Sequence, residues 1–88
     1  MSDAELLKEL ETVMQALGIE LRFENGEFNG GLCRISGRPV FLINRNLPPT
    51  RRLQILCHYL SRLDLSTVYL LPAVRSRLEM ENGGGSLS

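Results

Sequence analysis

The chain has little of the side-chain chemistry on which most catalytic and metal sites depend. Its 88 residues include two cysteines, one histidine and a single lysine. Cys33 and Cys57 form no CxxC pair and are too few for a disulfide scaffold, so we expect reduced, inward-facing thiols. One histidine, His58, and two such thiols cannot complete a tetrahedral zinc site. The sequence therefore predicts that the protein binds no metal and uses no cofactor.

Long hydrophobic runs are also missing. No stretch of about 18 apolar residues is present, as a membrane-spanning helix would require. The first residues, MSDAELLKELE, are acidic where a secretory signal would be basic and then apolar. These features predict a cytoplasmic protein with no membrane partner.

The length and composition bound the architecture. With 43% hydrophobic residues, the chain is long enough for one domain and too short for two. We expect a single domain over residues 1–81. After Asn82 the sequence reads GGGSLS, which predicts a disordered tail over residues 82–88.

The net charge of zero hides an uneven distribution along the chain. Residues 1–27 hold seven acids against Lys8 and Arg22, whereas residues 28–78 hold eight arginines against Asp64 alone. A basic segment of this kind can bind anions or nucleic acid, or it can be neutralised by an acidic helix packed beside it. The sequence leaves both readings open.

Local patterns predict an α+β fold. Ser2 and Glu5 form a capping box, and leucines recur at helical spacing until Gly18, which indicates an N-terminal helix. Alternation over 19–24 and a hairpin over 32–43 indicate three strands. Pro48 and Pro49 begin a second long helix, and Pro72 begins a short third one. We expect a three-stranded antiparallel meander with the two main helices packed on one face.

The predicted hairpin assigns side chains to faces of the sheet. A loop of either two or four residues is expected to set Ile35 opposite Val40 and Cys33 opposite Leu42, and the wide loop over 36–39 is favoured because Pro39 lacks an N–H. One face then carries Cys33, Ile35, Val40 and Leu42 and is expected to pack against the helices. The other face carries Leu32, Arg34, Phe41 and Ile43.

The segment Gly30 to Arg62 contains VFLIN, LPP, an arginine pair and His58 in an order that suggests a family. It resembles the core of the small bacterial zinc peptidases that cleave phage repressors and radiation-response regulators. Members of that family carry HExxH, in which two histidines one turn apart bind zinc and the glutamate activates water. Here Tyr59 and Arg62 stand at the glutamate and second histidine positions. The resemblance therefore implies a core without peptidase activity, either a catalytically dead relic or a chance match.

Other catalytic patterns are absent as well. FNGGL lacks the GxxxxGK[ST] spacing of a phosphate-binding loop and leads into a strand. A Cys–His nucleophile pair is also excluded, because Cys57 is predicted to face inward and His58 outward. We expect no catalytic residues and no enzyme.

Two kinds of function remain. The first is a protein-interaction or self-association module, with a weak homodimer formed through an apolar surface. Its candidate interface residues are Leu32, Arg34, Phe41, Ile43, Ile55 and Tyr59. The alternative is a nucleic-acid-binding accessory protein, in which Arg45, Arg51, Arg52 and Arg62 contact phosphates. Against the alternative stand the zero net charge and the lack of any helix-turn-helix or RNP-like pattern.

Overall fold

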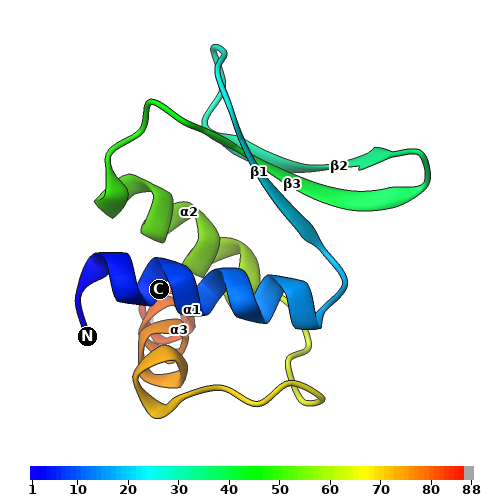
Figure 1. The fold of residues 1–88 in the computed structure, drawn as a ribbon. Helices are drawn as coiled ribbons and strands as arrows, with labels where there is room; N and C mark the ends of the chain where they lie inside the picture. The colour runs from blue at the N-terminus through cyan, green and yellow to red at the C-terminus, as the bar shows by residue number, and fades with distance from the viewer. Residues whose placement is uncertain (87–88) are drawn as a thin grey trace.

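Three helices and a three-stranded sheet form the protein in the computed structural model, which describes the backbone of residues 1–86 and the side chains of residues 1–81. The elements follow in the order α1 (Asp3–Ala16), β1 (Glu20–Glu24), β2 (Gly30–Ile35), β3 (Arg38–Asn44), α2 (Pro49–Ser61) and α3 (Pro72–Ser86). The helices lie on one side of the sheet (Figure 1). The α+β class predicted from the sequence is confirmed.

Helix α1 begins and ends as its sequence predicts. The hydroxyl of Ser2 accepts a hydrogen bond from the N–H of Glu5, and the carboxylate of Glu5 accepts one from the N–H of Ser2. At the other end, Gly18 has a φ of 76°, and the N–H of Ile19 donates to the carbonyl of Met14. This is the Schellman arrangement that glycine permits. The chain turns there directly into β1.

The sheet is mixed, and the predicted antiparallel meander is wrong. The strand order is β1-β3-β2, with β1 parallel to β3 and β2 antiparallel to β3. Strand β3, with the sequence RPVFLIN, has three buried residues, whereas β2 has none. A strand with neighbours on both sides favours a nearly continuous apolar run. β3 therefore lies at the centre, and β2 is left as an edge strand.

The hairpin between β2 and β3 is tighter than the sequence suggested. Ser36 and Gly37 have φ angles of 53° and 80°, as a two-residue turn requires, and Cys33 pairs with Val40. The predicted pairing of Ile35 with Val40 is thus wrong by two residues. Pro39 is tolerated because β1 begins only opposite Val40, so Pro39 has a neighbouring strand on one side.

The face of the sheet that packs against the helices is the opposite of the predicted one. Phe41 and Ile43 are 3% and 0% exposed and belong to one core cluster with the buried residues of α1, α2 and α3. The buried residues of α2 are Leu53, Leu56, Cys57 and Leu60. Leu63, which the helical spacing also predicts to face inward, lies beyond the end of α2 and is half-buried. Cys33 and Ile35 lie on the far side of the sheet, where Ile35 is exposed.

Helix α3 packs against α2, and its buried residues Val74 and Leu78 belong to the core cluster. Its backbone continues to Ser86 and so extends into the segment for which the sequence predicts a disordered tail. Residues 87 and 88 lie outside the described part of the chain, and the domain boundary after residue 81 stays a prediction. None of the helices described is long and apolar enough to cross a membrane.

Candidate functional site

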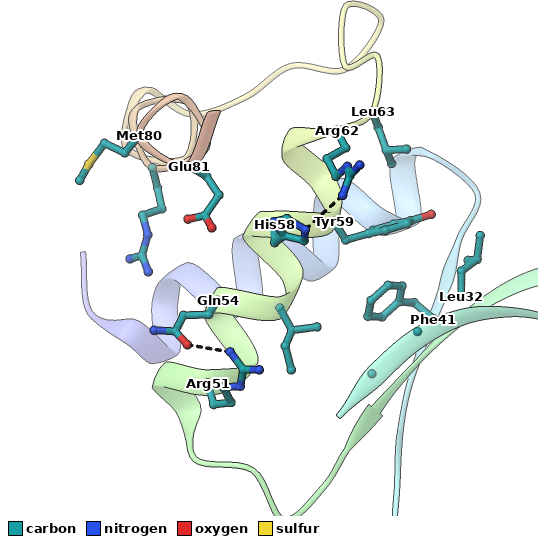
Figure 2. Close-up of a pocket in the computed structure, with 14 residues that line it drawn as sticks. Leu32, Phe41, Arg51, Gln54, His58, Tyr59, Arg62, Leu63, Met80 and Glu81 are labelled. Atoms are coloured by element: carbon teal, nitrogen blue, oxygen red, sulfur yellow. Dashed lines mark hydrogen bonds between the residues drawn. The ribbon is translucent and has the colours of Figure 1, made fainter. Parts of the chain in front are cut away.

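A groove of about 1120 Å³ lies between the edge strand β2, the outward side of α2 and one side of α3 (Figure 2). We call it the α2 groove. Its apolar lining comes from Leu32, Phe41, Ile55, Tyr59, Leu63 and Met80, with Gly30 and Gly31 beside them. Its polar lining comes from Arg51, Gln54, His58, Arg62, Arg77 and Glu81. The groove therefore combines an apolar floor with a largely basic rim.

Two aromatic rings fix the floor of the α2 groove. The rings of Phe41 and Tyr59 pack with centroids 4.5 Å apart and planes inclined by 44°. Burial raises the pKa of the Tyr59 phenol. At the β2 end, Gly30 lets α2 approach closely, because a Cβ there would stand 3.1 Å from Cγ2 of Ile55 and 3.0 Å from the carbonyl oxygen of Leu42. A larger residue at position 30 would be tight, because the side chain of Ile55 and the carbonyl of Leu42 would have to shift by a few tenths of an ångström.

The basic rim consists of arginines that no described acid neutralises directly. Nη1 of Arg51 donates to Oε1 of Gln54 at 3.1 Å, and Nη1 of Arg62 lies 3.3 Å from Nε2 of His58. Within the described residues, the only ion pair joins Glu20 to Arg22. The acids of α1 therefore form no ion pair with the arginines of the middle segment. Among the side chains that the structure describes, Glu81 is the one carboxylate that lines the groove.

Two of the four arginines predicted to bind nucleic acid donate hydrogen bonds to backbone carbonyls. Arg52 donates from Nε to the carbonyl of Leu47 and from Nη2 to the carbonyl of Arg45, and its guanidinium lies 5.4 Å from the centre of the Phe23 ring. Arg45 donates from Nη2 to the carbonyl of Phe23. These contacts tie the turn before α2 to β1. Of the predicted set, only Arg51 and Arg62 line the groove.

Only some of the candidate interface residues line the α2 groove with an accessible side chain. Leu32 is 50% exposed and lines the α2 groove together with the half-buried Ile55 and Tyr59. Phe41 contributes to the floor, but Phe41 and Ile43 are core residues and form no open surface. The helices therefore cover the part of the predicted homodimer surface that Phe41 and Ile43 were expected to form, and the weak homodimer itself stays a prediction. Arg34 lies outside the groove, where its Nη1 donates to the carbonyl of Gly37.

Sequence reasoning missed the contribution of α3 to this site. Arg77, Met80 and Glu81 lie at spacings i, i+3 and i+4, which places them on one side of a helix. That spacing is visible in the sequence. The sequence does not show that this side of the helix faces α2, because that arrangement depends on the path of the connection over 62–71.

Among the described residues, the histidine helix assembles no metal centre. His58 faces outward, whereas Cys57 is fully buried and its burial raises the pKa of the thiol. Neither cysteine lines the α2 groove. Over the described part of the chain, no three His, Cys, Asp or Glu side chains come together as a metal site requires. The lining of the α2 groove, with its apolar floor and arginine rim, suits a ligand that has acidic and apolar parts.

Comparison with protein-family models, with curated proteins and with solved structures finds no match for this chain. The resemblance of residues 30–62 to the zinc-peptidase core stays a prediction.

Proposed function

We propose that this protein is a non-enzymatic binding module that holds an acidic, partly apolar segment of a partner protein in the α2 groove. The single observation that carries this proposal is the combination of an apolar floor with Arg51, Arg62 and Arg77, none of which forms an ion pair with a described acid. Aromatic and arginine side chains are enriched where protein interfaces gain their binding energy.

A second copy of the chain fits the groove less well than an acidic partner. In a symmetric dimer formed through this side, the same patch of each subunit meets its counterpart. The arginines of one groove would then approach those of the other, with Glu81 as the only described lining carboxylate to offset them. Like charges brought together oppose association, whereas acidic side chains would steer a partner into the groove and fix its position.

Nucleic acid is also a weaker candidate than a protein. Arg45 and Arg52 are occupied by backbone carbonyls, so the basic segment offers fewer free guanidinium groups than its sequence suggests. The remaining arginines surround leucine, isoleucine and methionine side chains. Such a floor suits apolar side chains of a peptide better than a phosphate backbone.

The test is selection from a display library of random twelve-residue peptides against the purified protein, followed by fluorescence anisotropy with the most enriched peptide. We expect acidic, apolar peptides that bind more weakly as salt rises. Arg77→Glu should weaken binding about tenfold, since a charge reversal removes roughly 1 kcal/mol of attraction and adds repulsion.

The matched control is Arg75→Glu, which changes the net charge equally on the same helix but lies outside the groove. Its affinity should stay within about twofold of wild type. Equal losses in both variants would show that net charge, and not the groove, determines binding. If no peptide is enriched, or if labelled duplex and single-stranded DNA bind and peptides do not, the proposed function is wrong.

A further inference from the structure

We infer that the partner segment binds as an extended strand that pairs with the open edge of β2 and directs alternate side chains into the α2 groove. This inference rests on the proposed function and specifies how the segment is recognised. Its basis is the juxtaposition of two features. Strand β2 has β3 on one side only, and its residues Gly30, Gly31 and Leu32 also line the groove.

The edge of β2 is open for pairing. Five of its six residues are exposed, and only Cys33 is half-buried. An edge strand presents backbone N–H and C=O groups that a further strand can pair with, and proteins commonly protect such edges with proline, lysine, bulges or a covering loop. Strand β2 contains no proline and no lysine. Its single charged side chain, Arg34, reaches back to the carbonyl of Gly37 at 3.2 Å.

The groove supplies the side-chain specificity that backbone pairing lacks. In a strand, alternate side chains point to the same face, so every second residue of the added segment would lie on the helix side of the sheet. On that side, the half-exposed Leu32 and the half-buried Ile55 and Tyr59 can make apolar contacts with the added segment. Acidic residues in the same alternating series would reach Arg62 or Arg77 across the groove.

A helical segment would use the same surface differently. It would bind through residues spaced three and four apart and would leave the β2 edge unpaired. The glycines at the start of β2 favour the strand. Neither Gly30 nor Gly31 carries a side chain that an added backbone would have to displace, and a Cβ built at Gly31 would meet no heavy atom within 4 Å on its face of the sheet.

The experiment uses the most enriched acidic peptide from the display library and a series of its derivatives, each with one N-methylated backbone amide. For a paired strand, methylation should weaken binding tenfold or more at every second position and have little effect between them, because alternate N–H groups face the edge. Amide hydrogen exchange of the full chain should show new protection in β2 when the peptide is bound.

The outcomes separate this inference from the proposed function. One outcome would overturn strand pairing and retain binding in the α2 groove. In it, peptide binding depends on Arg77 but tolerates methylation at alternate positions, β2 gains no protection, and the important side chains lie three and four residues apart. Failure of every peptide to bind would overturn both. Light scattering that shows a dimer blocked by Leu32→Glu would assign the β2 edge to a second copy and so refute a partner segment.

Discussion

The guanidinium of Arg62 lies one helical turn after the imidazole of His58, with Nη1 3.3 Å from Nε2 (Figure 2). A guanidinium has only donors, so in this hydrogen bond Nε2 of His58 is the acceptor. In an HExxH helix, position 62 would carry the second zinc ligand. A cation in that place holds the first ligand position in a hydrogen bond and repels a divalent metal.

The first prediction concerns zinc. Wild-type protein purified without chelators should contain well under one zinc per chain by elemental analysis, because His58 has no second imidazole one turn away. Arg62→His creates that pair on one helix face. Added zinc should therefore raise the melting temperature of Arg62→His and leave that of wild type unchanged. Stoichiometric zinc in the wild type would contradict the prediction.

The second prediction concerns Phe41, which is 3% exposed and packs against Tyr59. Phe41→Ala should lower the free energy of unfolding by about 3–5 kcal/mol, measured by urea denaturation followed by circular dichroism. Its pairing partner on β2, Leu32, is 50% exposed and provides the control. Leu32→Ala should change stability by about 0.5 kcal/mol or less. Similar losses in both variants would mean that Leu32 is also part of the core.

The helices could be predicted from the sequence because their signals are local. The capping box of Ser2, the glycine at position 18 and the apolar stripe of α2 act within a few residues of each other. The sheet was harder to predict than the helices. Whether β1 pairs beside β2 or beside β3 depends on contacts between distant residues, and β3 is apolar on both faces. An error of two residues in the hairpin followed from placing Pro39 in the turn.

Some residues of the candidate site could be predicted from the sequence, but their assembly into one groove could not. Leu32, Tyr59 and Arg62 were identified from exposure and charge, and they do line one groove. The sequence could not separate Arg45 and Arg52 from Arg62, because it does not show whether a guanidinium group donates to a backbone carbonyl or is available to bind an anion. The contribution of α3 depends on tertiary docking, which no local pattern encodes.

The third prediction tests the structural role of Arg52. Arg52→Ala removes donors to two backbone carbonyls and the contact with the Phe23 ring, so we expect a loss of about 1.5–3 kcal/mol in unfolding free energy. Arg51→Ala is the control, since Arg51 is exposed and its guanidinium donates to the side chain of Gln54. That variant should lose about 0.5 kcal/mol or less. The reverse order of effects would refute the assignment.

The last prediction concerns alkaline pH and the thiol of Cys57, whose pKa burial raises above its ordinary value of 9.0. Below that value the thiol is protonated in both the folded and the unfolded chain, so its contribution does not change with pH. As pH rises above 9, the unfolded thiol ionises while the folded thiol keeps its proton, which favours unfolding. The unfolding free energy should therefore fall between pH 8.5 and 10, by at most about 1.4 kcal/mol per pH unit from this group. The phenol of Tyr59, whose pKa burial also raises, adds a further decrease in unfolding free energy at higher pH.

The control is Cys57→Ala, which removes the thiol and keeps the phenol. In urea denaturation at several pH values, its unfolding free energy should decrease less steeply with pH than that of wild type. Equal slopes in the two proteins would mean that Cys57 is not the group responsible.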